Sequence, residues 1–531
     1  MTAVGLLGVY LISWFIALLS PLALEYEGPA LWAAMELAKG HNIYDPLRLV
    51  QAPWAVTIYT PLYFVIGAPF QMYGYNFAGL RLISMLSDVA ALFFFYKLLG
   101  LYTRDRLRIS IGLLLFASYV SIWSGSLKAR VDMLALALSI AAMYFVVRAV
   151  EKGMATGRAQ EKDPNFNLNA TSSSVDLQAF DPTNPDALNY QFDSAEENFE
   201  DRVSKKQTAN IDAVPTIVVK LLPGIVISVA GICAKLSSIV ILPAVCVYLL
   251  FKKRYSELVI YGLSTLALGG AVFLIVNSVT GGGFLQHITF AFNVPFSSAE
   301  LNKHLHLLGV DWPKVVMVPT LALLWWMNGK GRGRLVLPFS LAVISGALTV
   351  YTIGTVHANL NHGMLFYCSL SWLTVVFIEA YPLSLGTTMI LASALCTYIL
   401  GTQVPIMYNL SNRMGKSVED LKQLKVAEQT IFVEDPTIAI VCGAKPLFVD
   451  VATFLQVWDR DKRSLSDLEK DLAQKKYPVV IINLNDSLNN KPPFYWSDSM
   501  LDSINKGYKK VDYVTGNGDL QQLYAPDDSK R

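Results

Sequence analysis

The sequence contains few charged residues. Asp, Glu, Lys and Arg make up 16% of its 531 residues, whereas about 25% is usual for a soluble protein. Hydrophobic residues account for 53%, and the mean hydropathy is +0.41. This composition excludes a disordered scaffold and a collagen-like fibre, and it predicts a chain that lies mostly in lipid. The formal net charge of only +2 provides no electrostatic basis for binding nucleic acid.

Cysteine is also scarce, with five residues in the chain. Cys442 stands alone in a polar region, and the other four lie inside apolar runs. No pair has the spacing of a disulfide framework or a zinc site. This excludes a small disulfide-stapled secreted module. The four in apolar runs are Cys233, Cys246, Cys368 and Cys396.

Long apolar runs, by contrast, are abundant. A helix needs about 20 apolar residues to cross the bilayer core, so we predict a mainly α fold, a polytopic transmembrane helical bundle of about eleven spans. The first run has neither a charged n-region nor a small-residue cleavage site, and we expect a retained helix there and not a signal peptide. The runs are 4–24, 79–99, 109–124, 131–150, 216–233, 236–251, 257–277, 314–328, 335–354, 363–381 and 385–402.

Basic residues in the short loops set the predicted orientation. Clusters follow the second, sixth and eighth runs, at 104–108, 252–254 and 330–334. All three lie on one side if the N-terminus is cytoplasmic, which places the C-terminal region outside. The histidines then all lie on the exterior side: His41, His287, His304, His306, His357 and His362.

We divide the chain into a transmembrane domain, formed by 1–150 and 215–402, and two polar segments. Residues 151–214 hold twelve acidic and six basic residues and few apolar anchors. Such a segment cannot bury enough apolar surface to fold, which predicts a disordered cytoplasmic insert.

The C-terminal segment, 403–531, differs from the insert. Short β-branched runs at 437–443 and 478–484 predict buried strands. Helical spacing of leucines predicts a helix over 464–476 between them. With a further helix and the segments YKKVDYV and LQQLYAP, this predicts a small exterior α/β domain. A purely structural cap is the alternative to a functional one.

The first exterior loop, residues 25–78, begins with two glutamates at a predicted helix start. Glu25 and Glu27 precede Pro29, which suits the first position of a helix. The helix predicted over 30–39 ends at Gly40, a common C-terminal stop. One interpretation is that the glutamates complement the helix dipole, worth about 0.3–1 kcal/mol. The other is a catalytic carboxylate.

Several short motifs follow one another in order. The acidic residue after the first run precedes a G-x-x-x-Y turn, a Y-x-P-L-Y segment, and L-R-L-x-S at the start of the second run. In this combination they resemble the GT-C superfamily of integral-membrane glycosyltransferases. The bacterial group that shares a domain with protein O-mannosyltransferases and the aminoarabinose transferase is the most similar. Further matches are Lys128-Ala129-Arg130-Val131-Asp132, Ala234-Lys235, Gly281-Gly282-Gly283-Phe284 and Asn361-His362.

The resemblance implies a reaction and a base. A sugar would pass, with inversion, from a polyprenyl-phosphate donor to a lipid, glycan or protein acceptor at the exterior face. A carboxylate of the first loop would act as general base. Counted back from Gly40, Glu25 occupies the family's usual acidic position; we favour Glu27 because it adjoins the helix start. Relatives with a lysine before the loop's proline use it on phosphate, and here that residue is Thr60.

The departing phosphate requires a cation or a helix N-terminus to stabilise its developing charge. Lys128, Arg130 and Lys235 are the candidates, because each lies beside a predicted helix start on the exterior side. Basic residues at that edge run against the positive-inside trend. For Lys235 the alternative is snorkelling toward lipid phosphates.

Four further residues are candidate substrate contacts: Tyr59, Asp132, Asn361 and His362. Asp132 could orient the acceptor or bind a metal, and it could equally pair with Arg130 or cap its own helix. We expect cofactor-free chemistry, since no tight acidic pair with metal-binding spacing lies near the first loop. The pair His304 and His306, two residues apart, gives only a weak metal signal.

Asp88 lies within the second apolar run. An intramembrane acid is a functional candidate by default, and it could line a proton or ion path or make a hydrogen bond inside the bundle. A path would suit the alternative function, a polytopic transporter or lipid flippase with an exterior cap. Transporters often show repeated halves and midplane polar groups; we find no such repeat, and the polar groups gather at the exterior ends instead. A non-catalytic protein whose tail binds a partner is a third hypothesis.

The family that the sequence resembles suggests that the membrane is a bacterial inner membrane.

Overall fold

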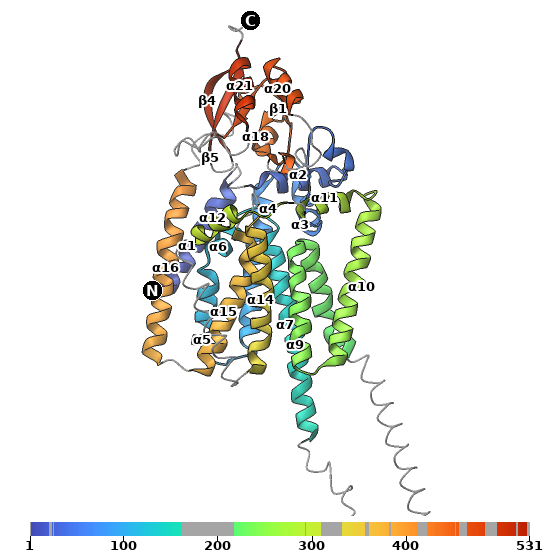
Figure 1. The fold of residues 1–531 in the computed structure, drawn as a ribbon. Coiled ribbons are helices and arrows are strands. Elements are labelled where there is room, and N and C mark those ends of the chain that lie inside the picture. Colours follow the sequence, from blue (N-terminus) through green and yellow to red (C-terminus); the bar gives the residue numbers. More distant parts are fainter. Residues whose placement is uncertain are drawn as a thin grey trace, which may run out of the picture.

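The computed structural model describes residues 2–20, 24, 26–161, 217–292, 294–308, 332–355, 360–381, 384–412, 422–451, 453–455, 465–483, 496–516 and 519–527. A bundle of long helices carries a small α/β domain at one end (Figure 1). We call this end of the bundle the domain end, and the opposite end the far end.

Seven helices of the described chain are long and apolar enough to cross a membrane. The chain is therefore a multi-pass membrane protein, as predicted. In the core of the bundle α4 packs along α7, and α14 packs against α15 and α9. The seven are α4 (Phe77–Leu99), α7 (Asp132–Glu161), the helix Ile217–Ala234, α10 (Tyr255–Val279), α14 (Arg332–Ile353), α15 (Met364–Ala380) and α16 (Leu385–Asn412).

The predicted count of eleven spans is not reached in the described part of the chain. The run 109–124 is a bent pair, α5 (Arg106–Ala117) and α6 (Val120–Ser126), whose axes differ by 76°; counted as one span it is the eighth. The extended backbone of Tyr119 separates the two helices. Two other predicted spans are shorter apolar helices, and the run 314–328 lies outside the described residues. The shorter helices are α1 (Thr2–Leu19) and α9 (Ile241–Phe251), which continues the 3-10 turn η5 (Leu236–Val240).

Short helices and connecting turns gather at the domain end (Figure 1). The described histidines belong to this region, since they lie on or directly after these elements. The basic turns between α4 and α5 and between α9 and α10 lie at the far end (Figure 1). The short elements are α2 (Gly28–Ala38), η1 (Pro46–Leu49), α3 (Leu62–Gly67), η2 (Ala68–Gln71), α11 (Gly283–Phe292), α12 (Ser298–Leu308) and η7 (Leu360–Gly363).

Helix α2 confirms the helix predicted after the first apolar run. Pro29 lies in its first turn, and Gly40 follows its end with φ of 78°, a left-handed conformation that glycine adopts without strain. The predicted start and stop are therefore both where the sequence signals place them.

The C-terminal domain contains a five-stranded sheet of order β2-β1-β3-β5-β4. Strand β1 is parallel to β2 and β3, whereas β5 is antiparallel to β3 and β4. Three helices pack with it. The elements are β1 (Thr430–Val433), α18 (Pro436–Val441), β2 (Lys445–Pro446), α20 (Ser466–Ala473), β3 (Val480–Ile482), α21 (Asp498–Gly507), β4 (Tyr508–Gly516) and β5 (Asp519–Pro526).

One predicted strand of this domain is wrong. Residues 437–441 belong to helix α18 and residues 442–443 to the turn after it, so the segment is not a strand. Asp435 caps the helix by accepting a hydrogen bond from the Thr437 N–H at 3.0 Å, Pro436 occupies its first turn, and Gly443 follows it with φ of 69°. These start and stop signals outweigh the β-branched composition. The strand predicted over 478–484 is confirmed by β3, and the helix over 464–476 by α20.

The C-terminal domain lies directly on the first loop. The Trp54 N–H donates to the Leu447 carbonyl at 3.0 Å, and the Val449 N–H donates to the Trp54 carbonyl at 2.8 Å. Helix α18 packs on α2, where a Cβ added to Gly28 would lie 2.6 Å from Cγ of Pro436. The domain thus holds the first loop at two separate points.

Candidate active site

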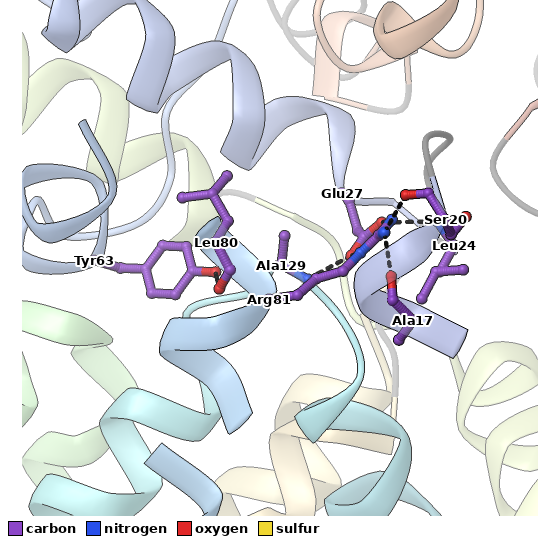
Figure 2. Close-up of polar contacts among 8 residues, drawn as sticks. All are labelled: Ala17, Ser20, Leu24, Glu27, Tyr63, Leu80, Arg81 and Ala129. Atoms are coloured by element: carbon purple, nitrogen blue, oxygen red, sulfur yellow. Dashed lines mark hydrogen bonds and ion pairs between the residues drawn. The ribbon is translucent and has the colours of Figure 1, made fainter. Parts of the chain in front are cut away.

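Glu27 forms a buried ion pair with Arg81 of α4 (Figure 2). The Arg81 guanidinium donates through Nη2 to Oε2 at 2.6 Å and through Nε to Oε1 at 2.9 Å, a bidentate arrangement. Both side chains are 0% exposed. Such a pair is strong only when its remaining polar atoms are also satisfied.

The remaining hydrogen bonds of the pair are made to backbone. The Leu24 N–H donates to Oε2 of Glu27 at 2.7 Å, and the Ala129 N–H donates to Oε1 at 2.5 Å. Nη1 of Arg81 donates to the carbonyls of Ala17 and Ser20, each at 2.6 Å. The pair therefore ties together the end of α1, the first loop, α4 and the segment before α7 (Figure 2).

This geometry differs from both roles considered for Glu27. Glu27 occupies the N-cap position of α2, but its side chain makes no capping hydrogen bond. Each carboxylate oxygen accepts two hydrogen bonds, so none of its acceptor positions faces a substrate. Glu25, the other candidate base, lies outside the described residues.

A second group of polar residues surrounds Asp132 at the start of α7. Nζ of Lys235 lies 2.5 Å from Oδ1 of Asp132, and Nε of Arg130 lies 3.1 Å from Oδ2. The side chain of Asp132 is 2% exposed, and those of Lys235 and Arg130 are 8% and 14% exposed. Of the roles considered for Asp132, pairing with Arg130 is observed, and Lys235 joins that pair.

Asn361 and His362 of η7 complete what we call the Asp132 cluster. Asn361 lies against Asp132, and His362 lies within electrostatic range of Asp132, Lys235 and Arg130. The amide atoms of Asn361 and Nδ1 of His362 are buried, and none has a hydrogen-bond partner among the described residues. Buried polar groups are normally paired, so these point to a ligand.

Two cations and one carboxylate meet in the Asp132 cluster. One carboxylate faces an ammonium and a guanidinium, and the unpartnered amide and imidazole atoms of the described residues lie beside these two cations. Cations and hydrogen-bond donors fixed in a buried place favour an anion, and most strongly one whose charge grows during a reaction. The structure thus brings together five predicted residues from three places that lie far apart in the sequence.

The segment 128–132 joins the Asp132 cluster to the ion pair of Glu27. Its Ala129 N–H reaches Glu27, and the Arg130 carbonyl accepts a hydrogen bond from Ser84 Oγ at 3.3 Å. Lys128 is half-buried in this segment, and its carbonyl accepts from the Arg130 N–H at 2.8 Å. The two polar groups therefore form one continuous site.

Tyr59 lies in a different environment. It packs with an apolar cluster beneath the first loop, and its carbonyl accepts a hydrogen bond from the Tyr44 hydroxyl at 2.7 Å. The neighbouring Thr60 hydroxyl donates to the Ile232 carbonyl at 2.9 Å. No hydrogen bond or ion pair joins Tyr59 to the described residues of the Asp132 cluster, so its substrate contact stays a prediction.

Two histidines near the site make contacts that the sequence did not reveal. Nδ1 of His287, on α11, accepts a hydrogen bond from the Thr57 N–H at 3.0 Å, and its Nε2 lies 3.2 Å from the Asp45 carbonyl oxygen. The histidine therefore connects two points of the first loop. Burial lowers the pKa of His287 to about 4. His304 of α12 is buried near His362, and its Nδ1 donates to the Glu300 carbonyl at 2.9 Å.

The weak metal signal of the His304 and His306 pair is not supported. His304 is buried, whereas His306 is exposed, because residues two apart lie on different faces of a helix. Within the described ranges, no group of three or more His, Cys, Asp or Glu residues could hold a metal ion.

Comparison with known proteins defines the fold. No protein-family model and no curated protein matches the sequence. The fold is similar to that of solved ArnT structures. Structures of ArnT, an aminoarabinose transferase, from Cupriavidus metallidurans match over 99% of this chain and 98% of theirs, with a TM-score of 0.58. Sequence identity is 11% to the apo structure and 12% to the structure bound to undecaprenyl phosphate.

Proposed function

We propose that the protein is a glycosyltransferase that moves a sugar from a polyprenyl-phosphate donor to an acceptor at the exterior membrane face, with inversion. The observation that carries this proposal is the Asp132 cluster: two cations and unpartnered buried polar atoms meet at the domain end, beside the first loop. The GT-C fold and a neighbour bound to undecaprenyl phosphate support it.

The donor phosphate would bind at the Asp132 cluster. Lys235 and Arg130 supply the positive charge that stabilises the departing polyprenyl phosphate. Lys128 is two residues before Arg130 in the sequence and is the third candidate cation. Asp132 holds both cations in place through its two oxygens. Asn361 and His362 would donate to the phosphate or to sugar hydroxyls, which would give their buried atoms partners.

The general base is a glutamate of the first loop. Because all acceptor positions of Glu27 are occupied, we assign the base to Glu25, which stands two residues before it. A base must reach the acceptor hydroxyl with a free lone pair. Glu27 then positions this loop relative to the segment 128–132, and hence the base relative to the donor cations.

The proposed orientation places the domain end outside a bacterial inner membrane and the N-terminus inside. Basic turns lie at the far end, as the positive-inside rule requires of the cytoplasmic side. The C-terminal domain, docked on the first loop, would cover the entry of the acceptor. The polar site lies at one end of the bundle, which argues against a transporter with a midplane site.

Purified protein in lipid, supplied with a panel of polyprenyl-phosphate sugars and membrane acceptors, tests the proposal. We expect the wild type to transfer the sugar. Glu25→Gln should lose this transfer, and Lys235→Met should weaken it. Absence of transfer with every donor, together with flux of a lipid or solute across proteoliposomes, would favour the transporter instead.

A further inference from the structure

Asp88 is buried inside the bundle without a compensating charge. It lies on α4 seven residues after Arg81, on the same face and two turns closer to the far end. Its side chain is 0% exposed, and neither carboxylate oxygen has a hydrogen-bond partner among the described residues. An ionised carboxylate inside a membrane is strongly disfavoured unless a positive charge accompanies it.

The neighbouring helices supply oxygen atoms but no cation. The Tyr10 hydroxyl of α1 and the Ser126 hydroxyl of α6 lie beside the carboxylate. The Tyr10 hydroxyl is buried and likewise has no hydrogen-bond partner in the described part of the chain. Ser126 Oγ donates to the Trp123 carbonyl at 2.8 Å and accepts from Trp14 Nε1 at 3.2 Å, so one lone pair is left.

Arg81 and Asp132, at the domain end of α4 and α7, are already paired with other residues, and Lys97 of α4 lies over the Phe93 ring, nine residues beyond Asp88. On α4, Arg81 is bonded to Glu27. At the start of α7, Asp132 is bonded to Lys235. Helix α5 carries its charges at the far end, where Arg108 contacts Asp105 and Glu379, and α6 has no titratable side chain. Tyr10 is the titratable group of α1 beside Asp88.

We propose that Asp88, Tyr10 and Ser126 hold one monovalent cation, a proton or a sodium ion, between α1, α4 and α6. Carboxylate and hydroxyl oxygens are the ligands that hard cations prefer, and apolar side chains of the same helices exclude water around them. Helix α6 leads into the segment 128–132, so an occupied site would stabilise the packing behind the candidate active site. The inference does not depend on the proposed transferase function.

Thermal unfolding of the full-length protein in lipid nanodiscs tests this site. Sodium chloride is compared with N-methylglucamine chloride at equal ionic strength, over a series of pH values. The variants are Asp88→Asn and Tyr10→Phe, with Asp467→Asn as a matched control, since Asp467 is 88% exposed in the C-terminal domain. If sodium occupies the site, a sodium concentration about a hundred times its dissociation constant should raise the wild-type unfolding temperature by about 3 °C. Asp88→Asn should abolish this increase.

If a proton occupies the site, sodium has no effect. The wild type then loses stability relative to Asp88→Asn as the pH rises, and infrared spectra show a protonated carboxyl band that disappears in Asp88→Asn. Should Asp88→Asn fail to fold, Tyr10→Phe must weaken the same sodium or pH response. A stability difference between wild type and variants that is equal in both salts and at every pH would overturn the proposal.

Discussion

Replacing Glu27 by glutamine tests whether this residue holds the structure together or performs the chemistry. The substitution removes the negative charge from a fully buried pair and leaves Arg81 without its counter-ion. It also places an amide NH₂ against donors, since each oxygen of Glu27 accepts two hydrogen bonds. Breaking a buried ion pair on one side costs about 3–5 kcal/mol. We therefore expect Glu27→Gln to lower the free energy of unfolding by that amount.

The matched variant is Glu25→Gln, two residues away. We expect its stability to stay within about 0.5 kcal/mol of the wild type, because the role proposed for Glu25 is chemical and not structural. Its turnover should fall by about 10²–10⁴-fold, the usual contribution of a general base. Thermal unfolding in nanodiscs and transfer assays on the same preparations separate the two effects.

A double-mutant cycle with Arg81→Met provides the internal check. Because the two side chains bond each other directly, the double variant should lose less stability than the sum of the single variants, by about 2 kcal/mol or more. The reasoning is refuted if Glu27→Gln unfolds like the wild type and loses turnover, or if the cycle shows no coupling.

Three further outcomes are expected. Lys235→Met should raise the donor KM about tenfold or more, whereas Lys235→Arg keeps the charge and most of the affinity; equal effects would contradict a charge role. Gly28→Ala should destabilise the docked C-terminal domain by about 1–3 kcal/mol, because its Cβ would lie 2.6 Å from Pro436, while Gly270→Ala, with open space around it, should not. Burial raises the pKa of Glu434 to about 7, above the usual 4.5, so this carboxyl costs the folded state stability as the pH rises from about 4.5 to 7. Glu434→Gln should therefore gain up to about 3 kcal/mol relative to the wild type across that range, and a pH-independent difference in urea unfolding would contradict this.

Local signals predicted many elements of the fold. The apolar runs correspond to seven long helices of the described chain, and Pro29 and Gly40 bound α2 as expected. The segment 437–443 shows how such signals compete, because its β-branched residues favour a strand while Asp435 and Pro436 start a helix. The helix-start signals decide the structure of this segment. A prediction that gave Asp435 and Pro436 priority over β-branched composition would have found α18.

The site was only partly predictable for a different reason. The residue types of the Asp132 cluster follow from the chemistry of a departing phosphate, and the structure brings Lys235 to Asp132 across 103 positions. The role of Glu27 could not be read from its surroundings in the sequence, since its partner Arg81 is 54 positions away. The burial of Glu27 depends on tertiary packing, and neither spacing nor composition records it.

The most direct test of the central claim measures donor binding at the Asp132 cluster. Protein in nanodiscs is titrated with undecaprenyl phosphate, comparing wild type with Lys235→Met and Asn361→Ala, and with Asp467→Asn as the exposed control. We predict saturable binding that both cluster variants weaken at least about tenfold and the control leaves unchanged. Equal binding by all four proteins would contradict the account, because the phosphate would then lie elsewhere.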